Sequence, residues 1–243
     1  MNKTAWEDRT WWLLVGGRRR LGRELAQALA KGHNLILTTS VSWDQEEAWI
    51  AELSKQTQVR CLLWDAASPD LVHTMMADLE ALGAEGVKVN SCVVVGGTFP
   101  ESPLGTWTPA SLEETWRLNL SFPLLAAQQV APHMADGGCI QFLLDTAIHR
   151  PFLKRLPYTA AKSGVAALVP GLARALAPRV RVVGHALGTV LPDAREDTAA
   201  LASRSLLGAV GTPEDLVRAL RYAAGSPYLT GEILTLDGGT RWV

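Results

Sequence analysis

Tyr158 and Lys162 stand four residues apart in the segment RLPYTAAKSGVAAL. In an α-helix this spacing puts both side chains on one face. A free tyrosine has a pKa of about 10 and is a poor acid–base catalyst at neutral pH, whereas a nearby ammonium lowers that pKa because it favours the phenolate. The pair therefore predicts proton transfer, although a half-exposed aromatic residue beside a surface lysine produces the same spacing in many helices.

A glycine turn rich in arginine is the second feature that indicates chemistry. The run LLVGGRRRLGREL, residues 13–25, leads from an apolar stretch through Arg18–Arg20 into a helical pattern. Gly16, Gly17 and Gly22 allow the backbone to come close to a ligand, and the guanidinium groups favour an anion. A solvated surface loop and a phosphate-binding turn both have this composition, so the position of the turn in the fold decides between them.

The elements that must position these residues alternate along the chain. Apolar runs predict strands at 11–15, 34–39, 59–64, 90–95, 139–144, 180–185 and 232–236. Apolar residues that recur at intervals of three and four predict helices at about 21–31, 44–55, 69–83, 111–134, 157–177 and 212–224. Strands that are apolar on both faces and separated by helices indicate an α/β, doubly wound, parallel sheet of about seven strands. No linker or repeat divides residues 1–243, which predicts a single Rossmann-like domain.

This fold puts the glycine turn and the tyrosine at one edge of the sheet. In a doubly wound sheet, ligands bind outside the carboxyl ends of the strands, and the turn after the first strand meets the pyrophosphate of a dinucleotide. The helix that contains Tyr158 follows the fifth predicted strand and begins at the same edge. We therefore expect a dinucleotide and a proton donor to lie together there.

The end of the second strand indicates which dinucleotide binds. A carboxylate there usually accepts from the ribose 2′-OH of the unphosphorylated cofactor. The segment LILTTSVSW instead offers hydroxyl groups, from Thr38, Thr39, Ser40 and Ser42. Together with Arg18 or Arg19, these groups can form charge-assisted hydrogen bonds with a 2′-phosphate. The sequence therefore favours NADPH over NADH.

Composition and charge exclude several other classes of protein. With 243 residues, 48% hydrophobic, the chain can bury one substantial core, and a net charge of −1 favours neither nucleic acid nor an anionic membrane. The N-terminus has Glu7 and Asp8 where a signal peptide needs an apolar stretch, and no run reaches the roughly 20 apolar residues of a membrane span. The three cysteines are widely separated and lack metal-ligand spacing. We expect a reduced cytoplasmic protein without a metal site.

From the glycine turn through Y-x-x-x-K to the C-terminal YLTGEILTLDGG, the chain resembles the short-chain dehydrogenase/reductase family. Within that family it is most similar to the pteridine reductase branch. Arg20 stands where most members have a glycine, which gives R-L-G as in the pteridine reductases. Asp145 takes the place of the usual catalytic serine, and the pteridine reductases also have an aspartate there. Phe99, in GGTFPESPL, corresponds to a phenylalanine that stacks on the pterin.

The resemblance also implies roles for other residues. Asp65 corresponds to an acceptor for the adenine amino group, although an aspartate after a strand often only caps a turn. Asn119 corresponds to the asparagine that kinks the 111–134 helix and holds a water beside the lysine, and Thr189 to the residue that meets the nicotinamide carboxamide. Residues 190–211 fit the substrate lid. The predicted cofactor-binding residues are Gly16, Arg18, Arg19, Arg20, Leu21, Gly22, Ser40, Asp65, Gly96, Tyr158, Lys162, Gly188 and Thr189.

Two segments depart from the pattern of the family. Val94-Val95-Gly96-Gly97 replaces the Asn-Asn-Ala-Gly motif after the fourth strand, and Leu187-Gly188 replaces the proline-glycine after the sixth. Neither change touches the predicted proton donor, but the first removes two side-chain amides near the adenosine end. His149 and His185 are interpreted as hydrogen-bonded bystanders rather than as acids.

The resemblance implies an NADPH-dependent reductase of a dihydropterin or dihydrofolate-type substrate. Its catalytic residues are Asp145, Tyr158, Lys162 and Asn119, and its substrate-binding residues are Arg20, Phe99, Asp145 and Tyr158. Helices 111–134 and 157–177 commonly form a tetramer interface in this family, so we expect a homotetramer. Two alternatives stay open: a general carbonyl or 3-oxoacyl reductase of the same family, and a catalytically idle NADP-binding scaffold.

Overall fold

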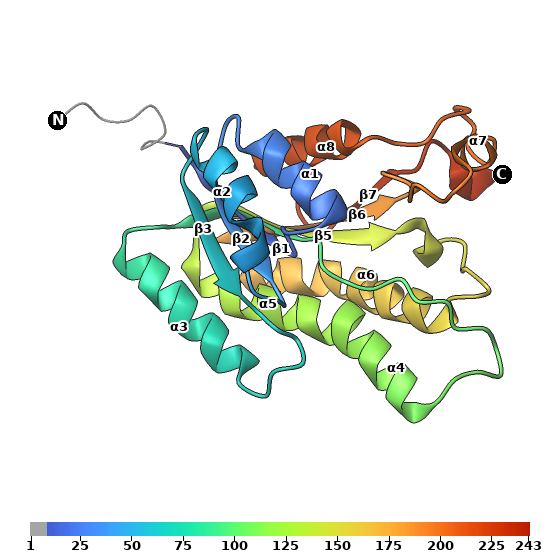
Figure 1. Cartoon of the computed structure of the whole chain (residues 1–243), viewed down its shortest axis with the longest axis horizontal. Helices are drawn as coiled ribbons and strands as arrows, with labels where there is room; N and C mark the ends of the chain where they lie inside the picture. The colour runs from blue at the N-terminus through green and yellow to red at the C-terminus, as the bar shows by residue number, and fades with distance from the viewer. Residues whose placement is uncertain (1–8) are drawn as a thin grey trace.

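A parallel sheet of seven strands forms the centre of the protein (Figure 1). The computed structural model describes residues 9–243, so Glu7 and Asp8, on which the expected absence of a signal peptide rests, lie outside the described residues. The strand order is β3-β2-β1-β4-β5-β6-β7. All strands are parallel, but β2 and β3 are added on one side of β1 and β4 to β7 on the other, so the order of the strands switches between β1 and β4. The strands are β1 (Trp11–Val15), β2 (Asn34–Thr39), β3 (Val59–Leu63), β4 (Val89–Val94), β5 (Met134–Asp145), β6 (Val180–Leu187) and β7 (Ile233–Leu236).

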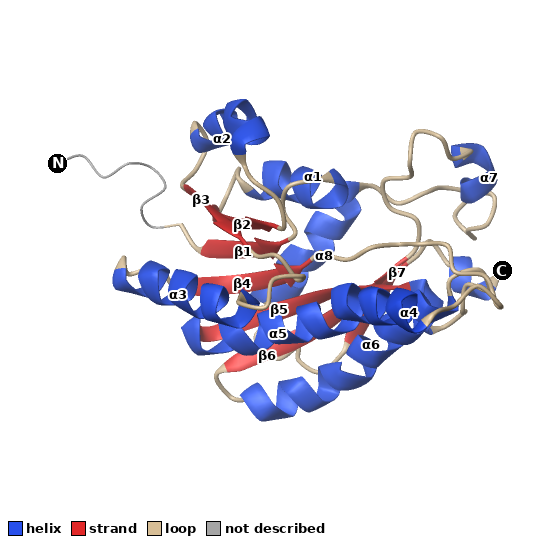
Figure 2. Cartoon of the chain, turned by 60° about the horizontal axis from the view of Figure 1, so that its bottom comes forward, coloured by secondary structure: helices blue, strands red, loops and turns tan. Residues whose placement is uncertain are grey.

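Helices cover both faces of this sheet, and each covered face has its own apolar core (Figure 2). On one face lie α3 (Leu71–Ala84), α5 (Phe122–Val130) and α6 (Leu156–Leu176), with α4 (Pro109–Trp116) beside α6. On the other face lie α1 (Arg20–Leu29), α2 (Glu47–Ser54) and α8 (Pro213–Gly225). Strand β1 contributes side chains to both cores, because Leu13 packs with the first set of helices and Leu14 with the second. Alternation within a fully apolar strand is what a sheet covered on both faces requires.

The predicted single-domain α/β fold with a seven-stranded parallel sheet is confirmed. The predicted strand 34–39 agrees with β2, whereas the predicted strand 139–144 is longer at both ends and becomes β5 (Met134–Asp145). The predicted helix 111–134 is confirmed as a helical segment that runs from 109 to 133, with a π turn around Asn119, where a kink is expected. It consists of α4, a π-helical turn η2 (Arg117–Ser121), α5 and a 3-10 turn η3 (Ala131–His133).

Side chains at two helix starts explain where α4 and α8 begin. Thr108 precedes Pro109 and accepts from the backbone N–H of Ser111, while the Ser111 hydroxyl accepts from the N–H of Thr108. Thr212 and Asp215 make the same reciprocal pair before α8. Such capping boxes satisfy N–H groups that the first turn of a helix cannot pair internally.

The buried apolar residues lie mainly around the middle of the sheet, whereas a helix that spans a membrane must be both long and apolar. Among residues 9–243, no helix is long and apolar enough to cross a bilayer. Cys92 and Cys139 are buried and Cys61 is half-buried, and all three are free thiols. Burial raises the pKa of the Cys61 thiol to about 11. At neutral pH these side chains therefore behave as small apolar groups.

Candidate active site

The glycine turn after β1 lies where the sheet order reverses. Gly16 has φ +94°, and its N–H donates to the Thr38 hydroxyl at 3.1 Å, which ties the turn to the end of β2. A Cβ on Gly22 would lie 2.1 Å from the Gly16 carbonyl oxygen, so only glycine allows α1 to begin this close to the turn. Gly96, after β4, donates to the Val15 carbonyl at 2.8 Å and closes the other side. The backbone alone therefore makes a narrow cradle at this edge.

Arg18 points into the protein from this turn. Its side chain is only 6% exposed, and its Nε lies 3.4 Å from the Glu46 carboxylate in the 3-10 turn η1 (Asp44–Glu46). Nε and Nη1 of Arg18 are buried without a hydrogen-bond partner. A buried guanidinium with unsatisfied N–H groups is costly unless an anion completes its shell. Arg18 is therefore well suited to a phosphate.

The other two arginines of the turn point elsewhere. Arg19 is exposed and precedes α1 without a side-chain capping bond. Arg20 has φ +46°, and its guanidinium donates to the Asp193 carboxylate at 2.9 Å and to the Leu191 carbonyl at 3.2 Å. Arg20 thus ties the cofactor turn to residues 190–211, the predicted lid. This ion pair could not be predicted from the sequence, because 173 residues separate its partners.

Tyr158 and Asp145 form the centre of the site. Asp145 ends β5 and Tyr158 lies in the first turn of α6, and the Tyr158 hydroxyl donates to Asp145 Oδ2 at 3.0 Å. The pKa of Tyr158 is not lowered in this structure, and the tuning of Tyr158 by Lys162 stays a prediction. Burial and, after it, the charge of Asp145 raise the pKa of Tyr158 above its ordinary value. Burial also raises the pKa of Asp145, against its hydrogen bonds from Ala147 and Tyr158.

Lys162 lies one turn further along α6 and is buried. Its ammonium donates to the Leu143 carbonyl at 2.9 Å and lies 5.8 Å from the centre of the Tyr158 ring. Burial lowers the pKa of Lys162 to about 8, partly offset by the charge of Asp145. The ammonium therefore contacts the strand backbone rather than the tyrosine hydroxyl.

Asn119 is fully buried in the π-helical turn between α4 and α5. Its amide donates to the Thr115 carbonyl at 3.0 Å and to the Thr98 hydroxyl at 3.2 Å, and its Oδ1 accepts from the Thr98 N–H at 3.1 Å. A Cβ on Gly97 would lie 2.5 Å from Asn119 Oδ1 and 3.8 Å from Lys162 Nζ. Asn119 therefore fixes the loop after β4 close beside Lys162.

Phe99 lies on this loop and faces the tyrosine. The two rings meet edge to face with centroids 4.8 Å apart, and Phe99 is half exposed. Sequence reasoning missed Arg155, whose guanidinium lies 4.0 Å from the centre of the Phe99 ring and donates to the Phe99 carbonyl at 2.6 Å. Arg155 also pairs with Glu101 at 3.2 Å. Its place three residues before Tyr158 was the only available signal.

The remaining predicted cofactor residues lie around the same edge. Ser40 and Thr189 are exposed, and Asp65 accepts from the Ala67 N–H at 2.9 Å, so one of its oxygens caps a turn. Gly188 packs on Asp237, and a Cβ there would lie 2.8 Å from the Asp237 Cα. A cavity of about 360 Å³ lies between Thr189, the 190–211 segment and the residues that follow β7.

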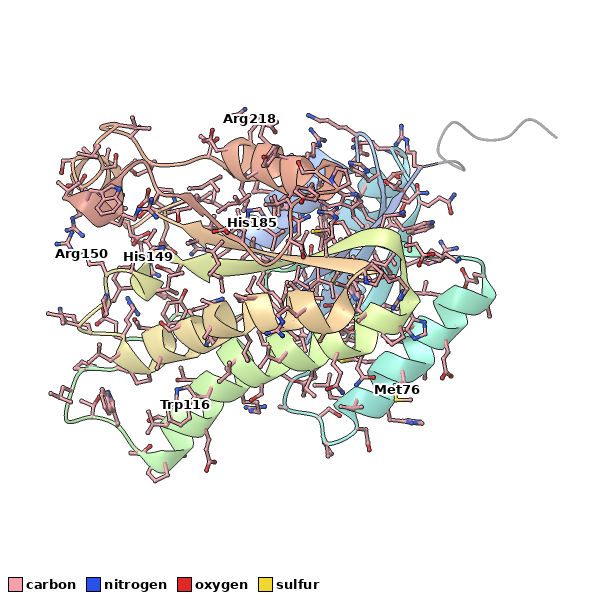
Figure 3. The ribbon with its side chains drawn as sticks, turned by 180° about the vertical axis from the view of Figure 1, so that it is seen from behind. Met76, Trp116, His149, Arg150, His185 and Arg218 are labelled. Carbon is pink, nitrogen blue, oxygen red and sulfur yellow. The ribbon has the colours of Figure 1, made fainter. Side chains whose placement is uncertain are left out.

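His149 and His185, the two histidines interpreted above as bystanders, differ in burial (Figure 3). His185 is buried on β6 and hydrogen-bonds to Gln141 Oε1 at 2.8 Å, and burial lowers its pKa to about 4. His149 is exposed, at the end of the molecule beside Arg150. Within residues 9–243, no group of three or more His, Cys, Asp or Glu side chains is arranged to hold a metal ion.

Comparison with known proteins identifies the family. The family model described as enoyl-(acyl carrier protein) reductase matches residues 16–241. A short-chain dehydrogenase/reductase from Serratia marcescens superimposes with a TM-score of 0.85 at 26% identity, over 96% of this chain and 98% of that one. The chain belongs to the short-chain dehydrogenase/reductase family. It is therefore an NAD(P)-dependent oxidoreductase by family.

Two further members of the family are similar over almost their whole length. The granaticin polyketide synthase putative ketoacyl reductase 2 of Streptomyces violaceoruber is 27% identical over 93% of this chain and 94% of that protein. FolM alternative dihydrofolate reductase 1 of Brucella canis, complexed with NADP, has a TM-score of 0.85 at 22% identity, over 96% of this chain and 95% of that one. At this identity the second likeness shows the fold alone.

The residues of this short-chain oxidoreductase fit an NAD(P) cofactor. Gly16 and Gly22 allow the turn to pack directly against neighbouring backbone, where any Cβ would clash, and Arg18 has two buried N–H groups without a hydrogen-bond partner. When bound, the nicotinamide ring exchanges a hydride with the substrate. At the same edge of the sheet, the Tyr158 hydroxyl carries a proton that it donates in a hydrogen bond to Asp145.

Proposed function

We propose that this protein is an NADPH-dependent reductase of a pteridine, of the dihydropterin or dihydrofolate type, with Tyr158 as proton donor. The observation that carries the proposal is the 3.0 Å hydrogen bond from Tyr158 to Asp145, next to the half-exposed ring of Phe99. A carboxyl group can accept from the amino-substituted edge of a pterin, and an aromatic ring offers a stacking surface. Both features suit a flat heterocycle better than a small ketone.

The charges around Tyr158 keep its hydroxyl protonated, although they also make it a weaker acid than a free tyrosine. Burial and Asp145 raise the pKa of Tyr158, so its hydroxyl stays protonated at neutral pH. Because the pKa of Asp145 is also raised, this carboxyl can hold a proton closer to neutrality than an exposed aspartate does. In the proposed step, Tyr158 gives its proton to the reduced ring, and a protonated Asp145 replaces it. Asp145 and Tyr158 then share one proton between two sites.

The preference for NADPH rests on Arg18. Its two N–H groups that lack a hydrogen-bond partner match a phosphate, and residues 38–42, at the end of β2 and just beyond it, contain no carboxylate. Calorimetry with the purified protein tests the preference directly, and tighter binding of NADH than of NADPH would remove it. Arg19, which is exposed, gives a matched comparison: Arg18→Met should weaken NADPH binding more than Arg19→Met does.

The experiment that tests the function is NADPH oxidation with a panel of dihydropterins, dihydrofolate, quinones and ketones. Turnover of pterins supports the proposal. The second candidate is a general carbonyl or 3-oxoacyl reductase, favoured by the 27% identity to a putative ketoacyl reductase over nearly the whole chain. Good turnover of ketones without any turnover of pterins would replace the first candidate by the second. An idle NADP-binding scaffold predicts nucleotide binding and no turnover with any member of the panel.

We also propose that the protein forms a homotetramer through α4, α5 and α6. Trp116 on α4 and Leu168 on α6 are 40% and 44% exposed, and large apolar side chains on neighbouring helices suit a helix-to-helix interface. Trp116 is labelled in Figure 3. Light scattering of the purified protein measures the mass, and a monomer or dimer at micromolar concentration would contradict the assembly.

A further inference from the structure

Glu46 is an acidic residue in contact with the arginines of the cofactor turn. It ends η1 (Asp44–Glu46), and its carboxyl is only 15% exposed. One oxygen lies 3.4 Å from Arg18 Nε, and the other accepts from Arg23 Nη1 at 2.8 Å. Arg23 in turn lies over the Trp49 ring, 4.4 Å from its centre. A single carboxylate therefore faces two guanidinium groups, one on each side.

The two contacts of Glu46 differ in quality. The contact with Arg23 is a short hydrogen bond, whereas the contact with Arg18 is a longer ion pair that leaves Arg18 Nε and Nη1 without hydrogen bonds. Arg18 is thus neutralised in charge but not satisfied in hydrogen bonding. An anion with several oxygens would complete its shell and would compete with Glu46 for it.

The direction of the Arg18 side chain indicates which anion this is. Glu46 belongs to the segment that follows β2, so Arg18 reaches from the first turn toward the end of the second strand. In doubly wound folds that strand end meets the ribose of the adenosine, while the glycine turn meets the pyrophosphate. Arg20 reaches the other way, to Asp193. The group that Arg18 can take is therefore a phosphate on the ribose.

We propose that Glu46 is a selectivity residue for the cofactor: it competes with the ribose 2′-phosphate for Arg18 and so limits the preference for the phosphorylated dinucleotide. The proposal rests on the NADPH dependence proposed above, but it concerns only nucleotide binding. It does not depend on which substrate is reduced. The carboxylate that usually stands at the end of β2 is missing from the sequence. The Glu46 carboxylate, which follows β2 in the chain and forms an ion pair with Arg18, lies near that position instead.

The test is calorimetry on the protein without cofactor, with 2′,5′-ADP and 5′-AMP as probes. Glu46→Gln removes the charge but keeps an oxygen that accepts from Arg23, so the packing of η1 on α1 is preserved. We expect this variant to bind 2′,5′-ADP about tenfold more tightly, which corresponds to about 1.4 kcal/mol, and 5′-AMP within twofold of wild type. Glu52→Gln is the matched control, because Glu52 is 63% exposed on α2 and pairs with Lys55.

A second variant shows whether Arg18 transmits the effect. In an Arg18→Met background, Glu46→Gln should change the affinity for 2′,5′-ADP by less than twofold, since the competed group is gone. Circular dichroism and thermal unfolding check that each variant is folded. If folded Glu46→Gln bound 2′,5′-ADP with unchanged affinity, or bound both probes more tightly by the same factor, the proposal would be overturned. The proposed reduction of a pterin would not be affected by that result. Tighter binding of NADH than of NADPH by wild type would instead count against the proposed NADPH dependence.

Discussion

Replacing Lys162 by methionine should stabilise the protein at neutral pH while it damages the site. Lys162 is 7% exposed, and burial lowers its pKa from 10.5 to about 8. At about 1.36 kcal/mol per pKa unit, holding this ammonium inside the fold costs about 3 kcal/mol at pH 7. Methionine fills a similar volume without charge, but it leaves the Leu143 carbonyl without its 2.9 Å hydrogen bond, a loss of about 1–2 kcal/mol. The net gain expected for Lys162→Met is about 1–2 kcal/mol.

The difference in stability between Lys162→Met and the wild type should change with pH in a defined direction. Because the pKa of Lys162 is lower in the folded state, the unfolded chain binds more protons between pH 8 and 10.5. The wild type therefore gains stability relative to Lys162→Met across that window, and the advantage of the variant shrinks from pH 8 upward. Urea unfolding at pH 7, 8, 9 and 10 measures it, with Lys154→Met, at an exposed position, as control. A difference that is constant with pH, or a variant less stable than wild type at pH 7, would refute the reasoning.

Three further predictions concern the proton donor, its partner and the turn. Tyr158→Phe should abolish reduction and leave nucleotide binding within about twofold, since only a hydroxyl is lost; appreciable steady-state turnover would require another acid. Asp145→Ser should lower pterin reduction about 100-fold in kcat and spare ketone reduction, because serine still donates a neutral hydrogen bond; unchanged pterin kcat would contradict the role of Asp145. Gly22→Ala should destabilise the fold by about 2 kcal/mol and weaken nucleotide binding, because its Cβ would meet the Gly16 carbonyl at 2.1 Å. Gly32→Ala, with open space around its Cβ, is the thermal-unfolding control and should show neither effect.

Apolar periodicity predicted the order of strands and helices well because the central strands are covered on both faces. Strand β2 is buried along its whole length, and its boundaries are those predicted from the sequence. Between residues 111 and 134 periodicity predicted the helical segment but not its π turn. There the Asn119 amide takes the Thr115 carbonyl, and Pro123 has no N–H to donate, so the chain widens into a π turn. A side chain that competes for backbone groups is invisible to an apolar pattern.

The parts of the site whose positions follow from the backbone could be predicted from the sequence. The partners of long side chains could not. Tyr158 and Asp145 meet because α6 begins beside the end of β5, which the strand order fixes. The contacts of Arg18 with Glu46 and of Arg20 with Asp193 depend on the paths of two loops. Arginine side chains are long, and a loop shift of a few ångströms changes their partner. For this reason the sequence indicated that the turn was cationic without indicating where each charge points.

The buried charges also bear on the protonation state of Tyr158. An alcohol can be oxidised only if a base takes its proton, and the candidate base is the Tyr158 phenolate. Burial and Asp145 both oppose that phenolate, and the Lys162 ammonium donates to the Leu143 carbonyl rather than to the tyrosine. The protonated hydroxyl is thus the resting form, ready to donate when a hydride has arrived at the substrate. Asp145 therefore sets the protonation state in which Tyr158 rests, while the direction of the overall reaction depends on the substrates and not on this residue.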